Sequence, residues 1–188
     1  MGRNSFLKAA VLGLFIATAV AMSSAQAINS GAQPIALNAT LGESLTVNLS
    51  AAAVNFTLTA GSAANPGSTT ITATTAWVLK PGRTAMTVDA YFASAAAALT
   101  DGAGNNIPSS AFFISDNGGA SAALVNTVAF GGANAGLRLA NVAIGGGNRA
   151  GSRTDLMAYN INLTGGTLPN LPAGTYTGTL NIQAQATP

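Results

Sequence analysis

The chain alternates apolar and polar residues with a period of two through much of its length after residue 28. Three early runs, over residues 35–41, 45–49 and 54–58, carry apolar residues at every second position, mostly with Asn or Thr between them. Successive side chains of a strand point to opposite faces, so each run predicts a strand with one apolar face. The pattern is typical of antiparallel sheets that bury only one face.

Turn-forming residues separate further runs of this kind. Pro81 and Gly82 suit the two central positions of a type II turn, so residues 69–79 and 84–93 are predicted to be hairpin partners. More strands are predicted over residues 111–115, 122–130, 137–144, 156–163 and 175–184, with a glycine-rich basic loop at residues 145–153. About nine or ten short strands without a helix predict an all-β fold, an antiparallel β-sandwich.

The first 27 residues have the layout of a secretory signal peptide. Arg3 and Lys8 precede an uncharged apolar stretch over residues 9–22, and Ala25 and Ala27 are the small residues that signal peptidase accepts. We expect cleavage after Ala27, so that residues 28–188 form a single β-sandwich domain. A membrane anchor is the alternative, but a span needs about 20 apolar residues. We therefore expect a secreted protein, periplasmic in transit and then extracellular or at the cell surface, with no later transmembrane segment.

The amino-acid composition excludes several classes of catalytic and metal-binding site. The chain has no His and no Cys, so the usual zinc, haem, thiolate and Ser-His-Asp sites are excluded. Residues 28–188 carry five basic and five acidic side chains, so the basic pI of about 9.4 comes from the leader. Nucleic acid and anionic lipid require clustered surplus cations, which this part of the chain lacks. We expect no enzyme, no cofactor and no nucleic-acid partner.

A few charged residues could still form surface sites. Arg149 and Arg153 could contact anionic glycans or the carboxylates of a neighbouring subunit; the alternative is a solvated loop in which Arg153 pairs with Asp155. The segment over residues 101–106 offers oxygen ligands, but one carboxylate is weak for calcium. An isopeptide bond from Lys80 would require that lysine to be buried beside an Asn and a carboxylate.

The end of the chain, PAGTYTGTLNI at residues 172–182, resembles the last strand of bacterial secreted β-sandwich proteins, among them chaperone–usher pilins and spore coat protein U-type domains. With NRAGSRTD at residues 148–155 and IPSSAF at residues 107–112, the chain resembles small exported proteins of Acidobacteria. The resemblance implies a pilin-like, immunoglobulin-like sandwich that forms fibres by donor-strand exchange, in which an N-terminal segment of one subunit completes the sheet of the next.

Residues 33–41 suit the role of donor strand. Their apolar side chains recur at every second position, as pockets along an open sheet edge would require, at Ile35, Leu37, Ala39 and Leu41. The alternative is that this run is the first strand of the protein's own sandwich. The sequence therefore favours a structural surface or fibre subunit that contacts copies of itself or another surface protein. The alternative function is a secreted monomeric module for adhesion or glycan binding.

Overall fold

A computed structural model describes residues 30–188. The predicted signal peptide, residues 1–27, lies outside the described residues. Within that range the chain forms eleven strands and two short 3-10 turns, η1 (Ser109–Ala111) and η2 (Leu168–Asn170). The strands are β1 (Ser44–Leu49), β2 (Asn65–Pro66), β3 (Ile71–Val78), β4 (Ala85–Tyr91), β5 (Leu99–Thr100), β6 (Asn106–Ile107), β7 (Phe112–Asp116), β8 (Ala122–Ala123), β9 (Gly136–Ala143), β10 (Ala150–Ile161) and β11 (Asn181–Thr187).

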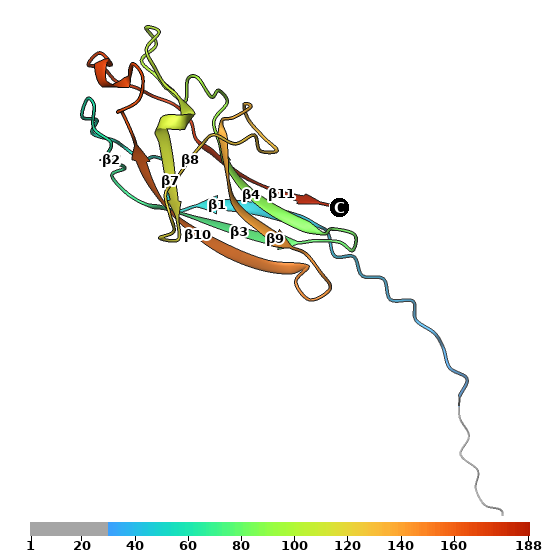
Figure 1. The fold of residues 1–188 in the computed structure, drawn as a ribbon. Helices are drawn as coiled ribbons and strands as arrows, with labels where there is room; N and C mark the ends of the chain where they lie inside the picture. Colours follow the sequence, from blue (N-terminus) through green and yellow to red (C-terminus); the bar gives the residue numbers. More distant parts are fainter. Residues whose placement is uncertain (1–29) are drawn as a thin grey trace, which may run out of the picture. The chain divides into compact units, whose positions relative to one another are not determined.

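The strands form two main antiparallel sheets (Figure 1). The larger sheet has the order β1-β3-β10-β7-β8, with β2 also paired to β10, and the smaller sheet has the order β11-β4-β9. β5 and β6 form a separate hairpin. The prediction of an all-β, sandwich-like fold is therefore confirmed. Among the described residues, no helix is long and apolar enough to cross a membrane.

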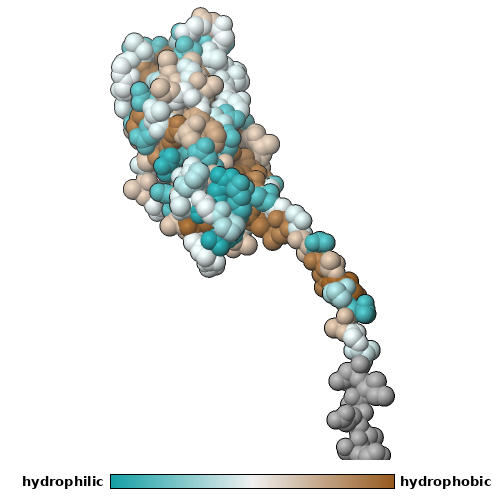
Figure 2. All heavy atoms as spheres, turned by 90° about the vertical axis from the view of Figure 1, so that its right-hand side faces the viewer, coloured by the Kyte–Doolittle hydropathy of each residue, from teal (hydrophilic) through white to brown (hydrophobic). Residues whose placement is uncertain are grey.

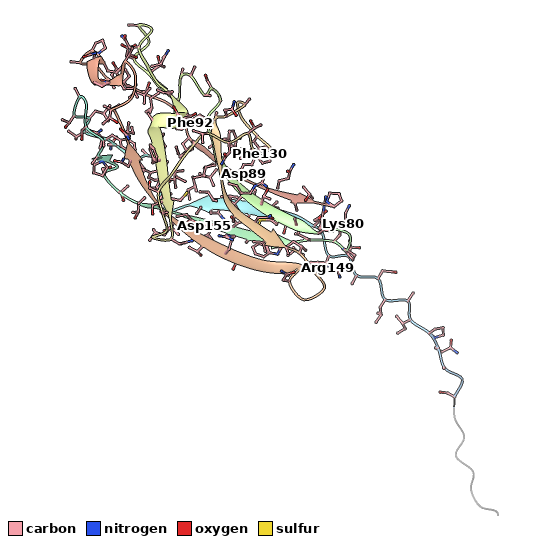
Figure 3. All side chains as sticks on the ribbon, viewed as in Figure 1. Lys80, Asp89, Phe92, Phe130, Arg149 and Asp155 are labelled. Atoms are coloured by element: carbon pink, nitrogen blue, oxygen red, sulfur yellow. The ribbon has the colours of Figure 1, made fainter. Side chains whose placement is uncertain are left out.

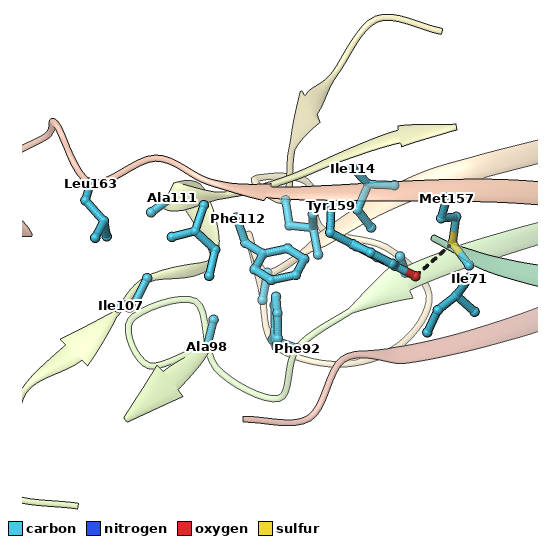
Figure 4. Close-up of a cluster of buried hydrophobic side chains, with 14 of the residues drawn as sticks. Ile71, Phe92, Ala98, Ile107, Ala111, Phe112, Ile114, Met157, Tyr159 and Leu163 are labelled. Atoms are coloured by element: carbon cyan, nitrogen blue, oxygen red, sulfur yellow. Dashed lines mark hydrogen bonds between the residues drawn. The ribbon is translucent and has the colours of Figure 1, made fainter. Parts of the chain in front are cut away.

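The apolar faces of the two sheets pack against each other. One buried cluster joins Phe92 of the segment after β4 to Phe112 and Tyr159 of the larger sheet, and Phe112 packs edge-on against Phe92 with ring centroids 5.2 Å apart. Figure 4 shows this cluster, in which the Tyr159 hydroxyl donates to Met157 Sδ at 3.7 Å. Each such side chain contributes roughly 1.5–3 kcal/mol when fully buried. Along β7 and β10, the buried residues of this cluster alternate with more exposed ones.

A second buried cluster fills the other end of the sandwich, around Trp77, Met86 and Val88. Trp77 is paired with Gly151 across β3 and β10. Its indole lies over that glycine, and its Nε1 donates to the carbonyl of Asn148 at 2.9 Å. The glycine therefore provides room for the largest side chain of the fold.

The predicted hairpin of residues 69–79 and 84–93 is wrong, although both strands exist. Gly82 has a φ of +98°, as a type II turn requires. β3 nevertheless pairs with β1 and β10, whereas β4 pairs with β9 and β11. The turn crosses from one sheet to the other because Trp77 and Met86 both bury their side chains in the space between the sheets.

Several other strand predictions need correction. β10 begins at Ala150, so residues 150–153 are strand and not loop. Of the run 122–130, only Ala122 and Ala123 form a strand, and Asn126 adds an isolated bridge to Gly136. The last strand runs over Asn181–Thr187 instead of residues 175–184. Residues 54–58 form a single bridge, between Phe56 and Gly67, and residues 35–41 lie outside any strand. Residues 35–41, most of 54–58 and most of 124–130 have a side-chain pattern that suits a strand, but their backbone has no partner strand.

The described chain comprises a compact unit over residues 40–188 and, before it, residues 30–39, which belong to a separate unit. This N-terminal stretch contains no helix or strand. Ile35 is 82% exposed and Leu37 is 90% exposed. Figure 2 shows hydrophobic residues alternating with polar ones along this part of the chain.

Candidate functional site: an apolar groove with unpaired rims

An apolar groove opens in residues 40–188 where β1 ends and β11 begins. Leu49 and Ile182 mark its start, and its floor is made by buried or half-buried side chains of the first core cluster. A first hollow of about 250 Å³ is followed by a second of about 550 Å³, and the two share part of their lining. The shared lining residues are Val54, Phe56, Leu99 and Gly178. Together the hollows form one groove along the side of the sandwich.

Neither rim of this groove belongs to a strand, and each makes only a single bridge, from Phe56 to Gly67 and from Thr177 to Thr100. One rim is formed by residues 51–58, directly after β1, and the other by residues 173–180, directly before β11. Among residues 30–188, the backbone N–H groups of residues 51–54 and 178–180 donate no hydrogen bond within the protein. Backbone groups require partners, and here only solvent or another chain can supply them. The groove therefore presents unpaired backbone N–H groups along its rims, as the open edge of a sheet does.

The second rim is held in place by its neighbours. Thr100 and Thr177 exchange two backbone hydrogen bonds, each of 2.9 Å. A Cβ on Gly178 would collide with the carbonyl oxygen of Ala98, so this glycine permits close packing of the rim on residues 98–100. The Tyr176 hydroxyl donates to the carbonyl of Pro172 at 2.9 Å. The rim is thus fixed without belonging to a strand.

The groove carries no charged side chain among its described lining residues. Burial raises the pKa of Tyr159, which lies in its floor, to about 12. Burial and, to a smaller extent, the carboxylate of Asp101 raise the pKa of Tyr176 at the rim. Both phenols stay neutral at physiological pH, so the groove suits an uncharged, apolar occupant.

The predicted donor residues lie outside the strands. Ile35, Leu37 and Leu41 are 82%, 90% and 84% exposed, and Ala39 is also exposed. Exposure of three large apolar side chains within seven residues often indicates an interaction site. The donor role of these residues remains a prediction, whereas the alternative, a first strand of the protein's own sandwich, is not what the structure contains.

An ion pair fixes the point at which the compact unit begins. Glu43 accepts from Arg83 Nε at 2.9 Å, and Lys80 Nζ lies 4.0 Å from Glu43. The hydrogen bond from Arg83 lowers the pKa of Glu43. Lys80 and Arg83 belong to the turn between β3 and β4, so β1 starts at this turn and reaches the groove only at its other end, Leu49.

The two arginines predicted as a surface loop occupy different environments. Arg153 lies in β10 and pairs with the fully buried Asp155, with Nε 2.8 Å from Oδ2. Arg149 follows the glycine loop near the turn that holds Lys80, as Figure 3 shows, and its carbonyl accepts from the Leu79 amide at 2.7 Å. Contact with an outside surface stays a prediction for both arginines, and Arg153 has its ion pair already within the protein.

The other polar candidates are occupied by local interactions. The Asp101 carboxylate accepts from the amides of Ala103 and Asn105 and from Asn105 Nδ2, at 2.6–3.0 Å. These bonds complete a turn and use the oxygens that calcium would need. Lys80 is 66% exposed, which is not the buried position that an isopeptide bond requires.

The rims of the groove were not identified as a site from the sequence. Residues 51–53 are three consecutive alanines that interrupt the alternation after β1, and residues 172–174 place a Pro and a Gly before the last strand. Both signals mark the end of regular pairing. Neither indicates that the two interruptions face each other across the core.

No protein family, no curated protein and no solved structure matches this chain in the three comparisons made.

Proposed function

We propose that the protein is a secreted structural subunit that assembles into cell-surface filaments by strand exchange. The observation that supports this function is the coexistence, in one chain, of an apolar groove with unpaired rims and an exposed segment with apolar residues at every second position. A strand seated in the groove would pair with the rim amides and bury its alternate side chains. Such docking removes apolar surface and unpaired backbone from water at once.

The occupant comes from another copy. Gly42 and Glu43 are the only residues between Leu41 and β1, which begins at the turn holding Lys80 and Arg83. β1 is six residues long, or about 20 Å. Two residues cannot carry Leu41 over that length to its own groove. Exchange between copies therefore produces an open chain of subunits, because each copy gives one segment and accepts one.

Strand exchange through the groove of residues 30–188 would use no charged side chain. The four ion pairs among these residues each join two side chains of the same folded unit, and the groove lining is uncharged. Assembly by this route should therefore depend little on salt, since screening weakens charge pairs and leaves apolar burial intact.

Negative-stain microscopy of the purified protein tests the proposal. Wild-type protein should form filaments, and Leu37→Asp should remain folded and monomeric because a carboxylate cannot enter the apolar groove without a partner. Asn38→Asp adds the same charge to the opposite face of the segment and is the matched control that should still assemble. Filaments from Leu37→Asp, or a wild-type protein that stays monomeric at high concentration, would overturn the proposal.

A further inference from the structure

A second hollow lies away from the groove, between η1, the end of β10 and η2. Its volume is about 630 Å³, within the range of small-ligand sites. Residues from three stretches of the chain line it, namely Ala96, Asn106, Pro108, Ser110, Ala111, Phe113, Asn162 and residues 164–168. It shares no lining residue with the groove, so a ligand here would not compete with an exchanged strand.

The polar side chains of this hollow have unused hydrogen-bonding capacity. Asn162 Oδ1 accepts from the amide and the hydroxyl of Thr164, at 2.9 and 2.7 Å, which fixes the orientation of the carboxamide. Within residues 30–188, Asn162 Nδ2 and the Ser110 hydroxyl have no partner, and Asn106 uses only its Nδ2. The hollow therefore presents a donor, an acceptor and a hydroxyl that can act as either.

Phe113 adds a flat apolar wall. It lies in β7, where its neighbours Phe112 and Ile114 point into the core, so its half-buried ring is on the outer face of the larger sheet. β7 is paired with β10 on one side and β8 on the other. A peptide could not add a strand at Phe113, because both edges of β7 are already paired there.

We propose that this hollow, lined by Asn106, Ser110, Phe113 and Asn162, binds a neutral saccharide. A sugar ring combines hydroxyl groups, each both donor and acceptor, with an apolar face of C–H groups that packs on an aromatic ring. The lining matches both features and contains no charged side chain among the described residues. Charged sugars would lose hydration without gaining a counter-charge. Each assembled subunit would then carry its own glycan site.

Calorimetric titration of the full chain with cellotetraose, mannotetraose, galactotetraose and chitotetraose tests the proposal. At least one should bind, and Asn162→Asp should weaken it about tenfold or more, because the variant keeps Oδ1 for Thr164 but replaces the free donor with a charge. Phe113→Leu should weaken it similarly while keeping an apolar side chain. Thr154→Ala, on an exposed position of the same β10, is the control that should bind like wild type.

The thermal midpoint of each variant shows whether it is folded, so a loss of affinity with an unchanged midpoint supports the site. Wild-type protein that binds none of these sugars at millimolar concentration would overturn the proposal. So would equal affinity in Asn162→Asp and wild type, or tighter binding of a Ser/Thr-rich neutral peptide of similar length. Leu37→Asp, which is designed to block assembly, should keep the affinity of wild type for the sugar. The sugar-binding proposal, which rests on no part of the assembly proposal, can therefore be tested separately from it.

Discussion

Gly151 lies directly beneath the indole of Trp77, and a Cβ on Gly151 would lie 2.8 Å from Cζ2 of the ring. No ordinary side-chain contact is that short, so the pair leaves no room for any residue but glycine. The contact also explains how a single large aromatic residue fits between two sheets made mostly of Ala, Thr and Val.

Gly151→Ala should destabilise the fold by about 1–3 kcal/mol, as overpacking of a core does. Chemical denaturation followed by Trp77 fluorescence measures the effect. Gly146→Ala, in the adjacent loop where a Cβ would contact nothing within 4 Å, is the control and should be close to neutral. Equal stability of the two variants would show that the indole is free to move.

The ion pair of Arg153 with Asp155 should contribute strongly to stability because Asp155 has no solvent exposure. Arg153→Ala leaves the buried Asp155 carboxylate with only Asn117 Nδ2, at 3.4 Å, as a side-chain partner, so it should cost about 3 kcal/mol. Asp155→Ala should cost a similar amount, and the double variant should cost less than the sum of the two. Additive effects in urea unfolding would contradict this coupling.

Asp116 predicts a pH dependence of stability. Burial raises the pKa of its carboxyl, and the neighbouring Asp155 carboxylate raises it further, although Arg153 acts in the opposite direction. The folded chain therefore holds this proton to a higher pH than the unfolded chain, so the stability that Asp116 contributes falls as the pH rises from the unfolded pKa, near 3.8, through the folded value.

Asp116→Asn supplies a permanent N–H in place of that proton. Relative to wild type, the variant should gain stability as the pH rises through this window, and the difference should be smallest near pH 3. Urea unfolding of both proteins at pH 3 and pH 7 measures it. A variant that is less stable than wild type at pH 7 would show that the charged form of Asp116 is favoured by the fold.

Alternating residues predicted strands where β1, β3, β4, β7 and β9 lie, and they predicted the inner face of β1, because alternation is a local property of a strand. Pairing between strands is not local. The turn at Pro81 and Gly82 has the predicted backbone, yet its strands join different sheets, since a tight turn can connect layers as well as neighbours. Residues 54–58 alternate like β1 but have no partner strand, and only the three-dimensional arrangement reveals this gap.

Of the two parts that strand exchange requires, only the donor segment could be predicted from the sequence. The apolar spacing of Ile35, Leu37, Ala39 and Leu41 is visible in the sequence, so a donor strand could be proposed. The acceptor groove is formed by residues 51–58 and 173–180, which are more than 100 residues apart in sequence. No local sequence pattern indicates that these two segments lie close together in the fold. The same limit applies to Ser110 and Asn162 in the second hollow.

A substitution that fills the groove should stop a subunit from accepting a donor strand but leave it able to donate its own. Ala53 lines the groove and is exposed, so Ala53→Trp should occupy part of it without disturbing the core. The variant keeps its own residues 33–41 and should add to a filament end and stop growth there, so small amounts should shorten wild-type filaments. Thr57→Trp, an exposed substitution on the same rim, should leave the length distribution unchanged.

Hydrogen–deuterium exchange tests strand insertion most directly, because it reports backbone pairing without assuming a register. The rate of hydrogen–deuterium exchange in filaments should be compared with the rate in the monomeric Leu37→Asp variant. Residues 35–41, 51–54 and 178–180 should all become protected on assembly, since the new strand pairs with both rims. Filaments whose groove rims exchange as fast as those of the monomer would contradict strand insertion.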